Sequence, residues 1–435
     1  MNVLFVVPWD NIGGVSHVVN RVAEHLRAQG HGVYFLLPGN QETPTEDVSL
    51  AGFPAFRLNL RVPVIPGRQT RSRTAFTLMF PLTLMRLSGL LRRLRIDVVN
   101  VHFPGGSGVY FAALRRLGLV RLVTSIHGAD LLPNGARPST MLPGISALLE
   151  ASDALVSPSD SYRNAVREAW PELTRPMRTI PNGIDPDELG YVAGTPDTTE
   201  EPPFVFSILQ MVHYKGVDIL IRAFAALCAD YPSLTLQLAS DGPQREDYER
   251  LAASLGVADR IRFLGFLQRP AVSAKLRACT LFVLPSRTNS ESFGIAAAEA
   301  MAVDRATIAS RIGGLPELIE DGVSGLLVPP GDVEALSAAM RRVLDDPTVR
   351  ERFGRAGGER IRRQFLWART GALYEQLFTD LASNVTASAR GPRPLGRRPL
   401  EATDDTPFST SLDRSHGTLG HSAPLSHAGT SQEGW

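Results

Sequence analysis

The sequence predicts an α/β fold made of two doubly wound parallel sheets, one in each half of the chain. Three observations support this. Short, continuously apolar segments alternate with amphipathic helical segments, the alternation comes in two sets, and turns rich in Gly, Pro or Asn separate the segments. Strands that read as continuous apolar runs are buried on both faces, as they are in parallel sheets covered by helices.

Each half supplies five apolar segments that we interpret as strands. The first of them, Val3–Val7, leads through the turn Asn11–Gly14 into an expected helix over Ser16–Ala28. The remaining expected strands are Val33–Leu37, Val98–His102, Leu122–Ile126 and Ala154–Ser157 in the first half, and Phe204–Leu209, Leu234–Ala239, Ile261–Leu264, Leu281–Pro285 and Thr307–Ser310 in the second.

A chain of 435 residues suits two domains and an additional segment. The break between the domains is expected at Pro181–Asp185 or in the polar stretch Ala193–Pro203. Ser, Thr, Pro, Gly and Arg dominate after residue 383, and such a composition buries too little apolar surface to offset its ordering entropy. The expected parts are a first domain at 1–183, a second at 184–364, a C-terminal helix at 365–382 and a disordered tail at 383–435.

Composition excludes several classes of protein. The net charge of +1 gives no general attraction to nucleic acid, so no nucleic-acid partner is expected. The two cysteines, Cys228 and Cys279, lie in apolar segments without other ligands at metal spacing, which predicts a reducing compartment and no metal site. Met1–Pro8 lacks the basic start of a signal peptide. The expected location is therefore the cytoplasm.

The strongest motif is the segment Pro285–Ala302, which follows a strand, opens a helix and contains Glu291 and Glu299. A continuous helix would separate these carboxylates by ~12 Å along its axis, whereas a retaining glycosidase needs its pair only ~5–5.5 Å apart. They cannot easily form an acid/base pair, but they can touch opposite ends of one elongated ligand. A nucleotide sugar is such a ligand, and amides at Phe293, Gly294 and Ile295 would face its negative part.

This segment resembles the Glu, seven residues, Glu motif of the retaining GT-B glycosyltransferases of the family-4 type. The resemblance covers roughly Met1 to Leu381 and implies two Rossmann-like domains that face a cleft. It also implies that Glu291 faces the donor sugar and that Glu299 accepts hydrogen bonds from ribose hydroxyls. A solvated helix face explains Glu299 alone equally well, whereas the Pro-Ser start and the Phe-Gly step favour the motif.

Three further positions match the same family in the same order. Gly14 allows close approach of a diphosphate or an acceptor, although an ordinary turn explains it too. The resemblance implies that His127, at a strand end, reaches the donor sugar; the alternative is a histidine satisfied by loop backbone, and His102 has a similar position. Lys215, beside Gly216, resembles the phosphate-binding lysine of the family, with a surface turn as the alternative. Asp241 and the loop Gly313–Glu317 also match family loops.

Together these residues imply a catalytic set of His127, Glu291 and Lys215. The implied mechanism is front-face transfer, in which the leaving diphosphate helps to deprotonate the acceptor hydroxyl. Lysine and helix-terminal amides supply the positive field, so neither a metal nor a cofactor is expected, and the nucleotide sugar is a substrate. The expected donor-binding residues are Gly14, Gln210, Phe293, Gly294, Ile295 and Glu299.

Several positions depart from the family pattern. Gln210 stands where the family usually has an arginine that binds the diphosphate. Asp304 and Ala306 replace a small glycine-containing turn, and Ser240 stands where glycine is usual. These changes keep a non-catalytic sugar-nucleotide-binding protein open as an alternative, and a nucleotide-sugar epimerase on the same fold is another.

The acceptor is the least defined part of the prediction. The stretch Arg61–Arg95 is rich in arginine and in large apolar residues, and a basic amphipathic surface can dock on anionic lipid at the inner face of a membrane. This interpretation suits a lipid-linked or glycan acceptor in polysaccharide or cell-envelope synthesis. A core helix with a solvated arginine face explains the pattern equally well, and Pro81 would kink a helix through it.

Overall fold

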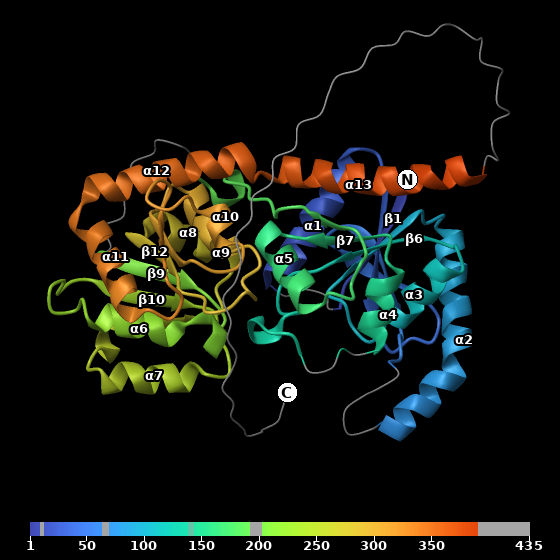
Figure 1. Ribbon diagram of the computed structural model, residues 1–435, viewed down its shortest axis with the longest axis horizontal. Helices are drawn as coiled ribbons and strands as arrows, with labels where there is room; N and C mark the ends of the chain where they lie inside the picture. The colour runs from blue at the N-terminus through green and yellow to red at the C-terminus, as the bar shows by residue number, and fades with distance from the viewer. Residues whose placement is uncertain (9–12, 63–68, 139–140, 142, 192–201, 390–435) are drawn as a thin grey trace, which may run out of the picture. The chain divides into compact units, whose positions relative to one another are not determined.

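The computed structural model describes residues 1–8, 13–62, 69–138, 141, 143–191 and 202–389 (Figure 1). Within these residues the chain forms two sheets, and every strand expected from the sequence is present. The expected turn residues Asn11 and Ile12, residues 192–201 of the polar stretch and the tail from Arg390 lie outside the described residues.

The first sheet has the strand order β3-β4-β2-β1-β5-β6-β7-β8 and is parallel except where β3 meets β4. Three of its strands were not predicted: β3 and β4 have charged or Pro-containing sequences, and β8 has three residues. The strands are β1 (Asn2–Val6), β2 (Gly32–Pro38), β3 (Thr45–Leu50), β4 (Phe53–Leu58), β5 (Val98–His102), β6 (Arg121–Ser125), β7 (Ala154–Ser157) and β8 (Met177–Thr179). The helices between them are α1 (Gly13–Ala28), α2 (Gln69–Arg93), α3 (Gly108–Arg116), α4 (Pro143–Ala151) and α5 (Asp160–Ala169).

The second sheet is parallel throughout, in the order β11-β10-β9-β12-β13-β14. Its strands are β9 (Phe204–Ile208), β10 (Thr235–Ala239), β11 (Ile261–Gly265), β12 (Leu281–Leu284), β13 (Thr307–Ser310) and β14 (Leu326–Val328). Its helices are α6 (Val217–Ala225), α7 (Arg245–Ser254), α8 (Arg269–Ala278), α9 (Ile295–Ala302), α10 (Leu315–Leu318), α11 (Val333–Asp345) and α12 (Pro347–Gln364). Continuous burial of β9, β12 and β13 explains their uniformly apolar sequences.

The strand order of each sheet indicates where a ligand can bind beside it. In the first sheet the order reverses between β1 and β5, and in the second between β9 and β12. Open parallel sheets bind ligands at the carboxyl ends of the strands beside such a switch point. The loops that follow β9 and β12 are those that carry Lys215 and Glu291.

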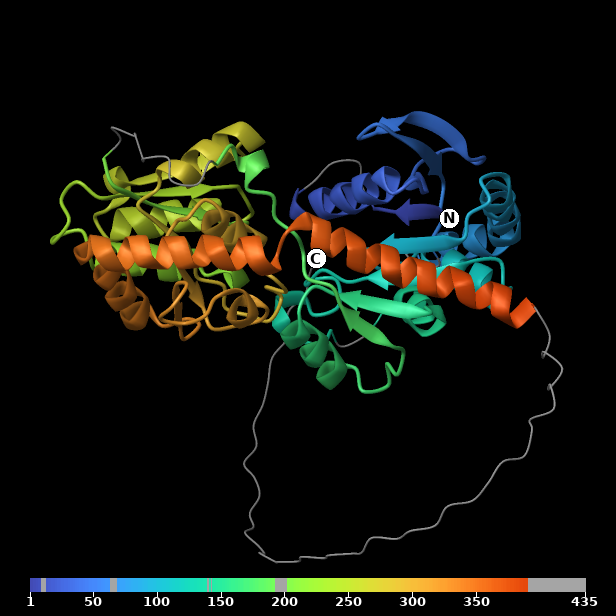
Figure 2. The ribbon, with the colours of Figure 1, turned by 90° about the horizontal axis from the view of Figure 1, so that it is seen from above.

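A last helix, α13 (Trp367–Ala389), packs beside α1 and covers one face of the first sheet (Figure 2). Its Tyr374, Leu377 and Phe378 are buried in the same core as Phe5. The expected helix at 365–382 therefore begins later and continues further. Residues 383–389, expected to be part of a disordered tail, are the last residues of this helix.

The chain passes between the domains twice, and the two crossing segments lie side by side. Ile184 donates its backbone N–H to the carbonyl of Phe365 at 2.7 Å and forms a parallel bridge with Leu366. Gly183 lies so close to Trp367 that a Cβ would overlap the indole. The Pro181–Asp185 segment, read from the sequence as the entry into the second domain, thus pairs with the returning segment.

Candidate functional site

The loops after β9 and β12 touch each other directly. Gly216 has φ 71°, and a Cβ there would overlap the carbonyl oxygen of Pro285. The backbone N–H of Arg287 donates to the carbonyl of Tyr214 at 2.8 Å, and the guanidinium pairs with Asp218 at 2.5 Å. Only glycine permits this approach, and the approach brings the neighbouring Lys215 beside the β12 loop.

Lys215 and Glu291 form a largely buried ion pair at this point. The Nζ–Oε2 distance is 2.7 Å, and the side chains are 20% and 11% exposed. The hydroxyl of Ser286 donates to the same Oε2 at 2.8 Å. Burial alone would lower the pKa of Lys215, but the charge and hydrogen bond of Glu291 outweigh it and raise the pKa. Lys215 is therefore a fixed positive charge and not a proton acceptor at neutral pH.

The backbone of the Glu291 loop is braced by the glycine loop after β13. The N–H of Gly314 donates to the carbonyl of Glu291 at 2.9 Å, and the N–H of Gly313 donates to Asn289 Oδ1 at 3.2 Å. Gly313 has φ 55°, and a Cβ there would overlap the Glu291 carbonyl. The expected loop Gly313–Glu317 therefore supports the Glu291 backbone.

Glu317, which the structure places in α10, has another partner. Its carboxylate accepts from the backbone N–H groups of Asp160 and Ser161, at 2.9 and 2.5 Å, at the start of α5. A carboxylate at a helix N-terminus satisfies free amides there and interacts favourably with the helix dipole. Glu317 therefore caps a helix of the first domain.

Helix α9 begins at Ile295, within the segment Phe293–Ile295 where the helix start was expected. Gly294, with φ 92°, precedes its first residue, so Glu291 lies in the loop and only Glu299 lies on the helix. The side chain of Phe293 is buried against Phe365 with ring centroids 5.7 Å apart, so only its backbone is left to face a ligand. Ile295 lies against Gly14, where a Cβ would be 2.9 Å from Ile295 Cδ1. The structure thus places Gly14 near the start of α9.

Glu299 has a partner that the sequence did not reveal. Glu299 is 6% exposed, and its carboxylate pairs with the guanidinium of Arg269 at the start of α8. Arg269 also lies 3.9 Å from Glu188, and Glu188 pairs with Arg21 of α1 at 3.0 Å. A buried carboxylate needs such a cation to stay ionised. The solvated helix face considered for Glu299 is therefore wrong.

His127 follows β6 in a loop that is hydrogen-bonded to the β12 loop. Asp130 accepts from the backbone N–H of His127 at 2.8 Å, and the hydroxyl of Ser292 donates to the His127 carbonyl. The hydroxyl of Ser290 donates to the Leu132 carbonyl at 2.8 Å. Burial lowers the pKa of the His127 imidazole to about 3, so the ring is neutral near pH 7.

The positions that depart from the family pattern have distinct roles. Gln210 is exposed after β9. Asp304 accepts from Tyr191 at 2.5 Å and from Arg362 at 3.2 Å, and so belongs to the crossing between the domains. Ser240 keeps the glycine-like φ of 89°.

Ala306, which also departs from the family pattern, and Asp241, which matches a family loop, have structural roles. Ala306 is buried in the core of the second domain. Asp241 accepts from Gly242 at 2.7 Å and pairs with Arg245 at 3.2 Å, which shapes the loop after β10.

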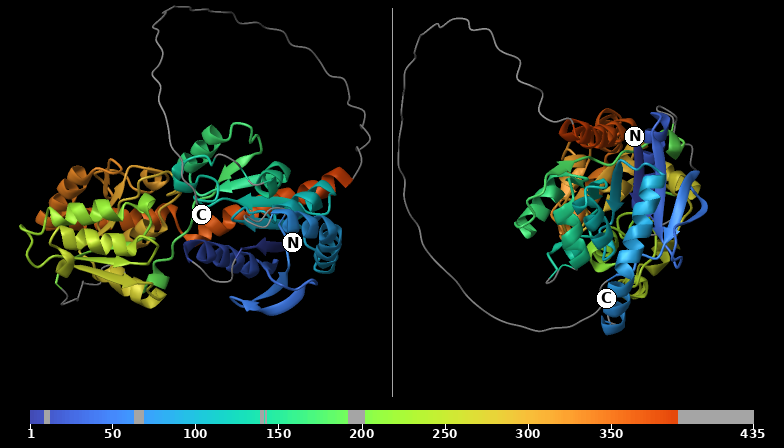
Figure 3. Two further views of the ribbon diagram at one scale, coloured as in Figure 1. Left: turned by 90° about the horizontal axis from the view of Figure 1, so that it is seen from below. Right: turned by 90° about the vertical axis from the view of Figure 1, so that its right-hand side faces the viewer.

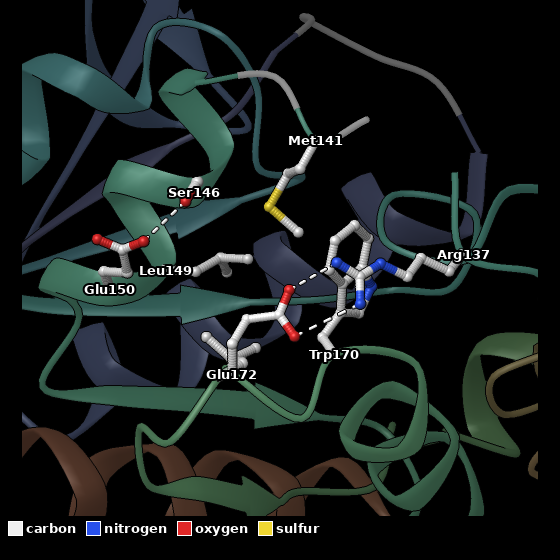
Figure 4. A pocket seen from close by; sticks show the side chains of 8 residues that line it. Arg137, Met141, Ser146, Leu149, Glu150, Trp170 and Glu172 are labelled. Atoms are coloured by element: carbon white, nitrogen blue, oxygen red, sulfur yellow. Dashed lines mark hydrogen bonds and ion pairs between the residues drawn. The ribbon is translucent and has the colours of Figure 1, made fainter. Parts of the chain in front are cut away.

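A pocket of about 200 Å³ lies in the first domain, beside α4 and α5 (Figure 4). Met141, Leu149 and Trp170 line it, and Arg137 lies 3.9 Å over the Trp170 ring. Arg137 also pairs with Glu172 at 2.6 Å. Ligand sites present a few polar groups that converge on the ligand, whereas these two charged groups bind each other. The loops after β6, β9 and β12 are therefore the candidate functional site.

Comparisons with known proteins agree with this architecture. Two family models match in tandem: one described as Glycosyltransferase Family 4 over residues 12–188, and one described as Glycosyl transferases group 1 over residues 195–360. A D-inositol 3-phosphate glycosyltransferase from Nocardiopsis dassonvillei is 31% identical over 388 residues, which cover 82% of this chain and 87% of that protein. A glycogen synthase from Mycobacterium tuberculosis is 29% identical, covering 91% of this chain and 98% of that protein.

Solved structures share the fold at lower identity. HepE from Anabaena, solved in complex with UDP, has a TM-score of 0.69 and 18% identity, covering 87% of this chain and all of that one. The order of the two matched models follows the order of the two sheets along the chain. The chain therefore belongs to glycosyltransferase family 4 and has the two-domain GT-B fold.

Proposed function

We propose that this glycosyltransferase moves a sugar, with retention of anomeric configuration, from a nucleoside diphosphate sugar to a hydroxyl acceptor. The observation that supports this most directly is the Lys215–Glu291 pair beside the N-terminus of α9, at the switch point of the second sheet. A fixed cation and free helix amides at one point suit a diphosphate that gains charge as it leaves. That HepE was solved with UDP supports a nucleotide in this fold.

Charge assignments suggest a role for each residue. Lys215 neutralises the leaving diphosphate, and donor binding exchanges part of its contact with Glu291 for contacts with phosphate oxygens. Glu291 then holds the donor sugar, while Glu299, fixed by Arg269, accepts from the ribose hydroxyls. The positive field comes from protein groups, so we propose that transfer needs no metal ion.

The protonation state of His127 bears on the stereochemistry of the transfer. A neutral imidazole with a pKa of about 3 does not gain a proton near neutral pH, so His127 is suited to orienting the sugar. In this assignment Glu291 accepts hydrogen bonds from the donor sugar and from the hydroxyl of Ser286, so it orients the sugar as well. With neither group acting as base, the leaving diphosphate takes the acceptor proton on the same face of the sugar, which gives retention.

Helix α2 suggests how a lipid-linked acceptor is reached. The span Arg73–Arg93 is apolar and long enough to cross a membrane by length and composition, with 22% of its best window buried. Leu87 and Leu90 pack in the core of the first domain, which holds the C-terminal half of the helix on the protein. On the other side Leu78 and Met85, two turns apart, are 72% and 64% exposed.

The surroundings of Leu78 and Met85 favour an anionic membrane surface. Helix α2 contains no acidic residue, and Arg73 and Arg92 are exposed near its two ends. Its N-terminal end reaches past the strands of the first sheet (Figures 1 and 3). Apolar side chains flanked by arginines suit a helix that lies in the headgroup region. We therefore propose a peripheral contact at the cytoplasmic membrane face, and an acceptor in glycolipid, polysaccharide or cell-envelope glycan synthesis.

Vesicle flotation tests the membrane contact. Vesicles of phosphatidylcholine with phosphatidylglycerol should retain the protein, and vesicles of phosphatidylcholine alone should retain much less. The double variant Leu78→Ser/Met85→Ser should lose the retention, whereas Leu117→Ser/Val323→Ser, which changes exposed apolar residues elsewhere, should keep it. Equal retention of both double variants would show that α2 is not the contact.

Nucleotide release tests the donor site. Purified protein is incubated in EDTA with UDP-, GDP- and ADP-sugars, first without an acceptor and then with glycan and lipid acceptors. Lys215→Met and Glu291→Gln should abolish release from the donor that is used. Lys275→Met is the matched control, because it removes the one other lysine of the sequence.

The products separate the remaining alternatives. An α-linked sugar from an α-linked donor, read by NMR, supports retention, and an inverted product refutes it. Epimerised free sugar would indicate the epimerase, and binding of a nucleotide sugar without turnover would indicate the sensor. If no nucleotide binds at all, the donor-site assignment is wrong.

A further inference from the structure

A line of buried polar side chains runs from His127 through the first sheet to helix α13. His127 Nε2 lies 2.9 Å from His102 Nδ1, and His102 Nε2 lies 2.7 Å from Asn100 Oδ1. Asn100 Nδ2 lies 3.0 Å from Ser125 Oγ, which lies 3.3 Å from the hydroxyl of Tyr374. His127 is half-buried, and the other four residues are buried. Strand β5 supplies two of them, at alternate positions and so on the same face of the sheet.

The direction of each hydrogen bond follows from one fixed group. Asn100 Nδ2 also donates to the backbone carbonyl of Val123 at 3.2 Å. A carbonyl only accepts, so the amide orientation is fixed and Oδ1 faces His102 as an acceptor. His102 must then carry its proton on Nε2. Burial, and then the neighbouring His127, lower the pKa of His102 well below its usual value, so the ring has one proton and its Nδ1 is an acceptor.

The same reasoning sets the tautomer of His127. Because His102 Nδ1 accepts, His127 must donate from Nε2, and its one proton is used there. Its Nδ1 then has a lone pair and no proton. Among the hydrogen bonds between described residues, none involves this nitrogen.

The ring plane of His127 is held as well. It stacks with His102 at a centroid distance of 5.2 Å and 21°, and with Phe103 at 5.7 Å and 13°. Phe103 has φ 59°, a left-handed conformation that is unfavourable for a residue with a Cβ. That strained residue packs directly on His127, which fits a ring whose position matters.

We propose that Asn100 and His102 are positioning residues, which hold His127 as the Nε2–H tautomer and turn its Nδ1 into a pure acceptor for a hydroxyl of the bound sugar. This proposal rests on the proposed donor site. It also restricts the donor: the group that meets Nδ1 must carry a proton. A sugar with fluorine in place of that hydroxyl can only accept and should bind poorly, although it is similar in size.

The tautomer can be measured without any activity. In protein labelled with ¹⁵N-histidine, two-bond ¹H–¹⁵N spectra at pH 7.5 distinguish Nε2–H from Nδ1–H, and His127→Asn identifies the His127 signals. We expect Nε2–H for His127 in the unmodified protein. The Nδ1–H form would overturn the proposal whether or not any donor is turned over.

Two variants test the chain of hydrogen bonds. His102→Phe keeps a flat ring for stacking but removes the acceptor, so His127 should become a mixture of tautomers. Tyr374→Phe removes only the hydroxyl at the far end of the line and should leave the tautomer unchanged. If His102→Phe does not fold, the tautomer in the unmodified protein still decides the matter.

Kinetics separate positioning from damage to the fold. With the donor found by nucleotide release, His102→Phe should lose about tenfold to hundredfold in kcat/KM, while its affinity for the free nucleoside diphosphate stays unchanged. The nucleotide does not reach His127 in the proposed site, so loss of nucleotide affinity would point to a structural role instead. Unchanged kcat/KM together with an unchanged tautomer in His102→Phe would refute the proposal.

Discussion

The Lys215–Glu291 pair allows stability and catalysis to be separated in one set of variants. Glu291→Gln keeps the size of the side chain and removes its charge, which leaves the Lys215 ammonium, 20% exposed, without its anion. At 2.7 Å and an effective dielectric constant of about 20, the attraction is about 6 kcal/mol. Removing both ions from water costs several kcal/mol each, so the pair as a whole is close to neutral for stability.

The free energies of unfolding should therefore not add. Each single variant, Glu291→Gln or Lys215→Met, leaves one uncompensated buried charge and should lower the free energy of unfolding by about 3 kcal/mol. The double variant leaves none and should lie within about 1 kcal/mol of the unmodified protein. The coupling energy of the cycle is the quantity of interest.

Activity, unlike stability, should not recover in the double variant. The double variant regains stability but has neither the cation nor the carboxylate, so its kcat should stay on the order of 10²–10³-fold below that of the unmodified protein. Urea unfolding followed by circular dichroism gives the stability, and nucleotide release at saturating donor gives kcat. Additive stabilities would show that the two charges are not coupled. A double variant that recovers activity together with stability would show that the single variants failed through folding alone.

Two other perturbations have definite expected results. His102 and His127 have folded-state pKa values below 6.5, so the unfolded chain binds protons that the folded chain does not, and stability should fall as pH drops below 6.5. His127, with a folded-state pKa of about 3, should contribute about 1.5 kcal/mol of this loss between pH 6.5 and 5, and His102 should contribute in the same direction. In urea unfolding His102→Phe should therefore show a smaller decline, and a decline equal to that of the unmodified protein would contradict the assignment. Gly128→Ala places a Cβ against the Ser290 carbonyl at φ 137° and should lower both Tm and donor affinity. Gly118→Ala is the control: Gly118 has a φ of 72°, and a Cβ there would have no atom within 4 Å, so the substitution should lower stability only through the backbone conformation. An equal loss of donor affinity in Gly128→Ala and Gly118→Ala would refute the steric argument.

The sequence was most informative where one local signal determines the structure. Strands β9, β12 and β13 are buried on both faces and therefore read as apolar runs. Strand β4, with Pro54 and Arg57, carries no such signal because it lies near the edge of its sheet and is partly exposed. Lys215 and Glu291 were found because both lie in family motifs, although nothing in the sequence says that they touch.

The composition of the chain also distinguishes Lys215. The sequence has 45 Lys and Arg residues, and only Lys215 and Lys275 are lysines. A chain that uses arginine almost everywhere but keeps a lysine beside Gly216 indicates a need for a compact cation there.

Contacts between distant segments could not be predicted in this way. The pairing of Arg269 with Glu299 and of His102 with His127 depends on which loops the sheet order brings together. Each pair joins residues that are 25 or more positions apart, where periodicity and spacing carry no information. Asp304 is a related case: as an unusual residue it suggested a weakened donor site, but its carboxylate binds Tyr191 and Arg362.

Helix α13 makes the first domain discontinuous along the chain, and this has a consequence for synthesis on the ribosome. Phe5 emerges early, but the side chains that cover it, Tyr374 and Phe378, emerge only after the whole second sheet has been made. Until then α13 does not cover this apolar face of the first sheet. The second domain, whose elements lie together between Phe204 and Gln364, can complete its core first. The first domain, although translated first, can therefore complete its core only after the second, and its uncovered apolar face is what a chaperone would protect during synthesis.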